Sequence, residues 1–410
     1  MLSRKYDLAR TRSPGLYFTL IVIAVLSFLQ WEPPGTYTWL ESFNWYLMIG
    51  VAGYLFILQR GRLNTSGIRF YIIFNFLFWL GGVLSLFRTP SPDQVLYSAV
   101  SMTIPFFLGL VMLSAMSTNK GRAIWLYTLL IAALLWAYEV VQLWFLYGEN
   151  IRHFLYGPGR DHNLVAIIFA MAATALMIIF LYGDFAVNKS TQFLIKGAAF
   201  STSLGLLICS FLTYSRSGFI ATIVGIFFTL FSLFLSERTR MPFVIFFILL
   251  LGGLSVLTSV VQTTNPTWFI KFNEITRLED PTTSVFVRTV LLQKALAVIA
   301  ENPFIGIGPG VFRTIYDPLI GHQSFYLVHN SYLAAWAENG ILGLLGYIIW
   351  LFLWIRLFLT KWKKLNLMKR ILLATFVPFY IMLFFLDIGG FPLTFMLIIF
   401  SSLDSDSEDE

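Results

Sequence analysis

Charge and cysteine are both scarce in this chain. Only 12% of its 410 residues are charged, against roughly 25% in a typical soluble domain, whereas 58% are hydrophobic. A soluble core cannot absorb so much apolar surface, so lipid must cover much of it. The single cysteine, Cys209, lies in an apolar stretch and excludes both a disulfide within the chain and a thiolate metal site.

Long apolar runs account for this composition. Most reach the roughly 17–25 residues that a helix needs to cross a bilayer, and lipid requires helices because it cannot satisfy free backbone groups. The first run follows a basic stretch, as in a signal peptide, but no small-residue cleavage site comes after it, so we expect a retained span. The sequence therefore predicts an all-α, polytopic membrane protein. Its twelve predicted transmembrane helices are approximately residues 16–31, 43–59, 70–87, 96–115, 123–147, 164–182, 194–213, 218–235, 243–261, 339–358, 371–386 and 390–403.

The basic residues lie mostly in alternate gaps between these runs. With the N-terminus placed inside, 19 of the 28 Lys and Arg residues are cytoplasmic and nine are outside. The positive-inside rule then predicts that both termini are cytoplasmic. The net charge of +7 reflects this topology, so we expect membrane lipids and no nucleic acid as partners. The nine outer residues are Arg88, Arg152, Arg160, Arg216, Lys271, Arg277, Arg288, Lys294 and Arg313.

One predicted outer loop is far longer than the rest, and it divides the chain. We expect a bundle of nine spans (1–261), an extracytoplasmic loop that carries the chemistry (262–338), three further spans (339–403) and an acidic, disordered cytoplasmic tail (404–410). Loops of this length are usually functional or disordered, and the aromatic residues of this one argue against disorder.

The loop contains a predicted helix followed by a glycine-rich turn. From Ser284 to Ala300 the apolar residues recur with helical periodicity, which predicts a helix lying on the membrane. Its apolar side would consist of Val287, Val290, Leu291, Leu296 and Ile299. Asn302-Pro303 would end the helix. The turn Gly306–Gly310 could cradle phosphate with its backbone amides, but it follows no strand and is not a dinucleotide motif.

Three polar residues on the predicted outer side are candidates for chemistry. Arg216 occupies a short hinge between two apolar spans, where an arginine needs an anionic partner. It either reaches outer lipid headgroups or binds a phosphate with its planar fork of donors, and Arg288 has the same two interpretations. His329 stands before a span and is either a solvated loop residue or a general base, because imidazole titrates near neutral pH.

Several motifs are missing from the sequence. There is no Walker motif, so ATP hydrolysis is not expected, and no His, Cys and Asp cluster with metal-ligand spacing lies on the outer side. Asp404 and Asp406 resemble the acid pair of nucleotide-sugar transferases but lie in the cytoplasmic tail. We therefore predict no metal and no cofactor. An outer-face reaction would need a pre-activated, membrane-borne donor such as a polyprenyl diphosphate sugar.

Three motifs, in this order, resemble the bacterial O-antigen ligase and O-antigen polymerase superfamily. They are Ser215-Arg216-Ser217-Gly218, then Arg288 with Glu301-Asn302-Pro303-Phe304-Ile305-Gly306-Ile307-Gly308, then His329-Asn330-Ser331-Tyr332-Leu333 through Glu338-Asn339-Gly340. The resemblance covers roughly residues 160–355. It implies a metal-independent, inverting glycosyltransferase of the membrane GT-C type in the bacterial inner membrane, with its active site on the periplasmic face. Such an enzyme takes a glycan from undecaprenyl diphosphate. A ligase, which we expect here, transfers it to lipid A-core in lipopolysaccharide biosynthesis, and a polysaccharide polymerase transfers it to a second lipid-linked glycan.

The resemblance also implies roles for individual residues. Arg216 and Arg288 would hold the diphosphate and stabilise it as it leaves, and His329 would orient or deprotonate the acceptor hydroxyl. These three form the predicted catalytic set. The other predicted substrate-binding residues are Gly306, Gly308, Asn330, Glu338, His162 and Asn163.

Two other functional classes remain as alternatives. A transporter of lipid-linked sugars would also be basic and multi-pass, but transporters usually have internal repeats and midplane sites, whereas the unusual residues here gather on one face. A structural or assembly partner without catalysis would leave the order of the motifs unexplained. Glu139, inside the fifth predicted span, is either a hydrogen-bonded interior carboxylate, which we favour, or part of a cavity for the lipid acceptor.

Overall fold

Helices make up nearly all of the part of the chain that the structure describes. The computed structural model describes residues 66–98, 116, 119–148, 162–185, 187–237, 284–312, 316–317, 322–323 and 328–385. The helices are α3 (Ser66–Ser85), α5 (Asn119–Tyr147), α7 (His162–Tyr182), α8 (Lys189–Leu212), α9 (Arg216–Glu237), α12 (Ser284–Glu301), α13 (Ser331–Lys361), the 3-10 helix η4 (Trp362–Lys364) and α14 (Leu367–Leu383). Two antiparallel strands of two residues each, β1 (Tyr316–Asp317) and β2 (His322–Gln323), are also present.

Five of these helices, α5, α7, α8, α9 and α13, are long and apolar enough to cross a membrane. They correspond to five of the predicted spans, and α3 and α14 correspond to two more. The predicted helical membrane fold is therefore confirmed for the described residues. The spans predicted at 16–31, 43–59, 243–261 and 390–403, and all but the first residues of the one at 96–115, lie outside them. The number twelve and the GT-C type stay predictions.

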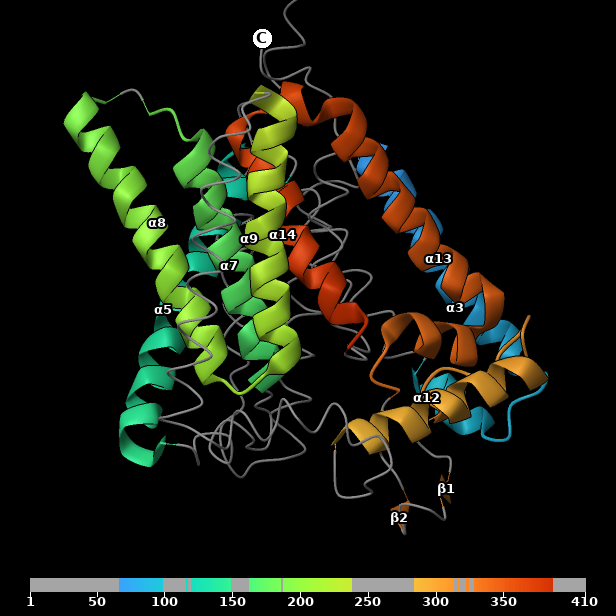
Figure 1. Cartoon of the computed structure of the whole chain (residues 1–410). Coiled ribbons are helices and arrows are strands. Elements are labelled where there is room, and N and C mark those ends of the chain that lie inside the picture. Colours follow the sequence, from blue (N-terminus) through green and yellow to red (C-terminus); the bar gives the residue numbers. More distant parts are fainter. Residues whose placement is uncertain are drawn as a thin grey trace, which may run out of the picture.

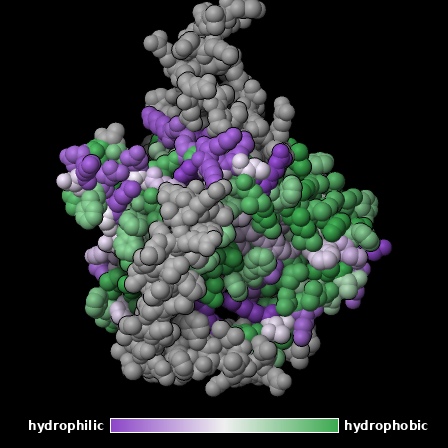
Figure 2. Space-filling model, turned by 45° about the horizontal axis from the view of Figure 1, so that its top comes forward, coloured by the Kyte–Doolittle hydropathy of each residue, from purple (hydrophilic) through white to green (hydrophobic). Residues whose placement is uncertain are grey.

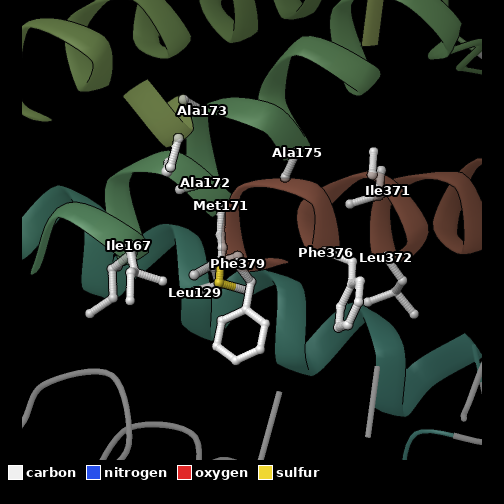
Figure 3. Close-up of a cluster of buried hydrophobic side chains, with 14 of the residues drawn as sticks. Leu129, Ile167, Met171, Ala172, Ala173, Ala175, Ile371, Leu372, Phe376 and Phe379 are labelled. Carbon is white, nitrogen blue, oxygen red and sulfur yellow. The ribbon is translucent and has the colours of Figure 1, made fainter. Parts of the chain in front are cut away.

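Helix α7 is the centre of the bundle. Most of its residues are buried, and it packs against α5, α8, α9 and α14, as expected for a helix that is apolar on every side. Figure 3 shows Leu129 of α5, Met171 of α7 and Phe379 of α14, which belong to one buried cluster. Small residues permit close packing here: a Cβ at Gly218 of α9 would overlap the Cβ of Ala166 on α7.

Helices α3 and α13 form a second unit beside this bundle (Figure 1). Phe74 of α3 packs edge-on against Tyr347 of α13, with ring centroids 5.7 Å apart. The centroid of the Trp350 ring lies 6.2 Å from that of Phe74. Helix α13 then joins α14 of the main bundle through η4. The Trp354 indole N–H donates to the Leu373 carbonyl at 3.0 Å, which links α13 directly to α14.

Helix α13 is broken near its start. It begins at Ser331, eight residues before the predicted span, and has non-helical backbone angles at Gly340 (φ 65°, ψ −161°). Figure 1 shows the short segment before this kink turned away from the long segment that follows it. The last residues of the predicted loop, 331–338, are therefore helical, and the break at Gly340 separates them from the long segment of α13.

The helix predicted from Ser284 to Ala300 is α12 (Ser284–Glu301). Of its predicted apolar side, Val290, Leu291 and Ile299 are buried against the protein, and Leu296 is 48% exposed. Leu291 packs in one cluster with Ala295 and the turn that follows α12. That α12 lies on the membrane stays a prediction.

The two ends of the molecule differ in charge. At one end, Tyr182 at the end of α7 contacts Trp362 of η4, with ring centroids 6.1 Å apart. Figure 2, in which this end is turned forward, shows hydrophilic residues gathered there and hydrophobic residues below. We call it the basic end; its described basic side chains are Lys120, Arg122, Lys189, Lys196, Arg356, Lys361, Lys363, Lys364, Lys369 and Arg370. The opposite, site end has Arg88, Arg216, Arg288 and Lys294. This separation agrees with the predicted orientation, which itself stays a prediction.

Candidate functional site

The turn between α8 and α9 is held by a network of buried polar groups at the site end. Tyr214 has a left-handed backbone (φ 58°). The next residue, Ser215, directly precedes Arg216, the first residue of α9. The Gly218 N–H donates to Ser215 Oγ at 3.1 Å, which is the bond that an N-cap residue makes. Ser215 Oγ in turn donates to Asn163 Oδ1 of α7 at 2.8 Å. The start of α9 is therefore fixed to the start of α7.

Arg216 is the first residue of α9, and its side chain is partly buried. A helix N-terminus carries unsatisfied N–H groups and a partial positive charge, so a cation placed there adds to a region that already favours anions. The prediction placed Arg216 in a hinge between two spans. In the structure it lies at the helical edge of that hinge, next to the Ser215 cap.

His162 and Asn163, predicted as substrate-binding residues, begin α7 and are both buried. Asn163 Oδ1 also lies 3.5 Å from Ser217 Oγ, which donates to it. The structure thus brings Asn163 next to the motif that contains Arg216, although 52 residues separate Asn163 from Ser215. Asp161, which precedes these two in the sequence, lies outside the described residues.

The glycine-rich turn uses its backbone amides to dock on α13. The Ile307 N–H donates to the Ala337 carbonyl at 2.9 Å and the Gly308 N–H to the Glu338 carbonyl at 2.8 Å. The Gly306 N–H donates to the Asn302 carbonyl at 3.0 Å. These amides have protein partners, so the geometry does not support the predicted phosphate cradle, and we leave Gly306 and Gly308 out of the proposed donor site.

The glycines of this region allow two backbones to approach closely. Gly306 has φ 74°, and a Cβ there would overlap the Glu338 carbonyl. Gly340 has φ 65°, and a Cβ there would overlap the Phe304 carbonyl. Both positions also need the left-handed backbone that glycine adopts most easily. The second and third motifs of the sequence therefore fold as one unit.

Glu338 and Asn330 have positioning contacts within this unit. Glu338 Oε1 accepts from the Phe312 N–H at 3.3 Å, which ties α13 to the second residue after the glycine turn. Asn330 caps α13, because its side-chain oxygen accepts from the N–H groups of Tyr332 (3.1 Å) and Leu333 (3.0 Å). Their predicted contacts with substrate stay predictions.

His329 precedes this cap in an uncommon backbone conformation. Its φ is 55°, a left-handed value that few residues other than glycine adopt and that often occurs at functional sites. The side chain is partly buried. Asn330 and α13 after it fix the backbone that carries the imidazole, so His329 is presented at the start of a helix, as Arg216 is.

Arg288 lies in the second turn of α12, and its side chain is partly buried. It comes one turn before Leu291 and two before Ala295, which pack in the same cluster as Phe312 and Val328. Figure 1 places the start of α9, α12 and the start of α13 at the same end of the molecule. The three predicted catalytic residues therefore come from three elements that share one end.

The end of α3 also belongs to this region, which sequence reasoning missed. Asn339 is completely buried, and Cβ atoms at Gly81 or Gly82 would press on it. Ser85 Oγ donates to the Gly82 carbonyl at 2.5 Å. The adjacent pair of glycines in a predicted span was the available signal, since small residues mark close helix packing in membranes.

Glu139 lies on α5 and is partly buried, between exposed Tyr138 and buried Val140. Its position at the border of the buried face is compatible with either interpretation given above. The interior carboxylate remains the one that we favour.

A comparison with protein families gives one match. Residues 201–348 match the family model described as O-antigen ligase. That stretch contains Arg216, Arg288, the glycine turn and His329, whereas α3 and the start of α7 lie before it. No curated protein matches the chain. The match supports an O-antigen ligase-like family for this membrane protein.

Proposed function

We propose that this protein is a glycosyltransferase of the O-antigen ligase type in the bacterial inner membrane. It would transfer a glycan from undecaprenyl diphosphate to a hydroxyl of lipid A-core at the site end, facing the periplasm. Two findings support the proposal: residues 201–348 match the O-antigen ligase family, and the three motif residues come from elements at one end of the molecule.

The observation that carries the proposal is the position of Arg216. Its backbone is fixed by the Ser215–Gly218 and Ser215–Asn163 hydrogen bonds, and it is the first residue of α9. A diphosphate that leaves an anomeric carbon gains negative charge in the transition state. A cation that is already in place stabilises that charge without reorganisation. Arg288 on α12 would supply the second guanidinium.

The reaction would be a direct displacement. The acceptor hydroxyl oxygen attacks the anomeric carbon from the face opposite the diphosphate, and its proton passes to His329. The bond between the anomeric carbon and the diphosphate oxygen breaks, and the diphosphate keeps the electron pair. The products are an inverted glycosidic bond and undecaprenyl diphosphate. The two arginines supply the positive charge, so we expect no metal requirement.

Polymerisation is the second candidate, because the same displacement would join two lipid-linked glycans if a second repeat unit were the acceptor. The family match is compatible with both acceptors, and the ligase is the one that we propose. A transporter ranks third, since the candidate residues gather at one end rather than at the midplane.

The test is transfer by purified protein in nanodiscs. Undecaprenyl diphosphate glycan is the donor, and lipid A-core and a second lipid-linked glycan are offered separately, with and without EDTA. We expect product with lipid A-core and no loss of rate with EDTA or without ATP. Product only with the second glycan would make the protein a polymerase. Movement of lipid-linked glycan across liposomes without any new glycosidic bond would favour the transporter.

A further inference from the structure

Basic side chains gather where α13, η4 and α14 meet at the basic end. Arg356, Lys361, Lys363 and Lys364 are all exposed. Among the acidic side chains that the structure describes, only Asp184 lies at this end, and it accepts a hydrogen bond from Gln192 at 3.3 Å. The junction is therefore strongly cationic. We call these four residues the basic junction.

Arg370 holds the backbone of this junction in place. Its Nε donates to the Trp362 carbonyl at 3.2 Å and its Nη2 to the Lys363 carbonyl at 2.9 Å. Its guanidinium also lies over the Tyr182 ring, 4.7 Å from the centroid, a distance at which a cation is attracted to an aromatic face. The lysines of η4 thus project from a fixed turn rather than from a loose linker.

An apolar stripe runs along α13 toward the same lysines. Phe352, Ile355 and Leu359 are 62%, 39% and 71% exposed, and their spacing of three and four residues places them on one face of the helix. Arg356 follows the same spacing, four residues after Phe352. From Phe352 to Lys361, the last residue of α13, the helix rises about 14 Å at 1.5 Å per residue, close to half of the roughly 30 Å hydrocarbon thickness of a bilayer. Lys363 and Lys364 follow directly in η4.

We propose that the basic junction and this stripe form a binding surface for an anionic phospholipid, with the phosphate on Lys363, Lys364 and Arg356 and an acyl chain along Phe352, Ile355 and Leu359. The charge selects an anionic headgroup, since each basic residue near a membrane surface adds to the attraction. The stripe favours a lipid over a peptide. The acidic tail 404–410 would match the charge of the lysines, but it has no apolar residue to cover the stripe.

The experiment measures lipid retention by native mass spectrometry of the full chain, with phosphatidylglycerol or cardiolipin and with phosphatidylcholine as the neutral probe. The variant is Lys363→Gln with Lys364→Gln. The matched control is Lys120→Gln with Lys189→Gln, which removes the same charge from exposed positions at the same end. We expect the variant to lose about 25-fold in apparent affinity for the anionic lipids, roughly fivefold per lysine. The control should lose less than about threefold in the same apparent affinity, because lysines that do not contact the bound phosphate act on it only through screened charge.

Three outcomes would overturn the proposal. Equal losses of anionic-lipid affinity in variant and control would mean that the overall charge of this end, and not the basic junction, attracts the lipid. Equal retention of phosphatidylcholine would remove the role of the phosphate charge. Deletion of residues 404–410 would raise lipid affinity more than about tenfold if the tail, as a tethered ligand, competed with lipid for the basic junction. That result would make the acidic tail the occupant of the basic junction in the full chain. Circular dichroism and size-exclusion profiles check that each variant is folded, and none of these readouts depends on transferase activity.

Discussion

Two junctions at the site end contain glycine and lie within the family match, but different groups make the contacts that fix them. At the α8–α9 turn, side chains make the fixing contacts: Ser215 and Asn163 hold the start of α9. At the turn before α13, backbone amides make them: Ile307 and Gly308 donate to carbonyls of α13. The first junction fixes the backbone at Arg216, the first residue of α9. The second uses its amides to build the scaffold.

The comparison shows why a glycine-rich turn is a weak sign of an anion site. A Cβ at Gly218 would overlap Ala166, and a Cβ at Gly306 would overlap Glu338, so both glycines permit close packing. N–H groups donate within the protein at both junctions: Gly218 to Ser215 Oγ at the first, and Ile307 and Gly308 to carbonyls of α13 at the second. An anion site requires amides that point to the ligand, and only hydrogen-bond partners, not glycine content, identify them.

The largest expected effect comes from removing Arg216, the cation of the first junction. Arg216→Ala should lower kcat/KM for transfer by about 10³ or more, because both donor binding and leaving-group stabilisation lose a charge-assisted contact. Arg216→Lys should recover little of this, since an ammonium lacks the planar fork. The measurement is transfer by purified protein at several donor concentrations.

Arg88 is the control for this substitution, because it is an exposed arginine at the same end. Arg88→Ala should leave transfer within about threefold, the scale of an exposed charge contact. Similar small losses at Arg216 and Arg88 would mean that Arg216 contacts headgroups and that the donor site lies elsewhere.

The next effect concerns His329. His329→Ala should lower kcat by roughly a hundredfold or more, the usual value of general-base help, and leave donor affinity nearly unchanged. This separation of kcat from donor binding distinguishes a base from an arginine that holds the diphosphate. Donor affinity can be measured with undecaprenyl diphosphate alone. A loss of donor affinity equal to that of Arg216→Ala would place His329 in the donor site instead.

Membrane spans were predictable because length and apolarity decide them locally. The predicted spans at 123–147 and 164–182 correspond to α5 and α7 with starts shifted by a few residues. The helix at Ser284 was predictable from its periodicity alone. Periodicity does not tell which apolar residues pack on protein and which stay exposed: Leu291 is buried and Leu296 is 48% exposed.

The candidate site was predictable only in its residue types. Arg216, Arg288 and His329 were selected from charge placement and motif order, and the elements that carry them share one end of the molecule. The partners of backbone amides were not predictable, because the Ile307 amide bonds to a carbonyl 30 residues later. The same reason hid the contact of Gly81 with Asn339: pairing between distant segments leaves no periodic signal in the sequence.

A third prediction breaks the second junction. Gly340→Ala and Gly306→Ala should each destabilise the protein, because the side chain meets a carbonyl and the positive φ adds strain of about 1–3 kcal/mol. A thermal shift assay in detergent should show a lower Tm for both. Transfer should fall in proportion to the folded fraction rather than through a specific loss of donor affinity.

The matched control for these glycines is Gly205→Ala on α8, where a Cβ would meet nothing within 4 Å. Its Tm should be unchanged or higher, since alanine is the better helix former by roughly 1 kcal/mol. If Gly306→Ala kept its Tm and lost donor affinity alone, the turn would be a phosphate cradle after all, as the sequence predicted.

The smallest expected effect tests how the first junction positions its arginine. Ser215→Ala removes the acceptor for the Gly218 N–H and the donor to Asn163, so the free energy of unfolding should fall by about 1 kcal/mol, as for other N-caps. Transfer at saturating donor should fall severalfold, because Arg216 loses its fixed backbone but keeps its charge. Ser215→Thr, which retains the hydroxyl, should restore most of both. Ser190→Ala, an exposed serine at the other end of α8, is the control and should change neither. If Ser215→Ala lowered Tm yet left transfer at the level of the control, the cap would serve folding only, and the preorganisation of Arg216 would have to come from contacts of its side chain.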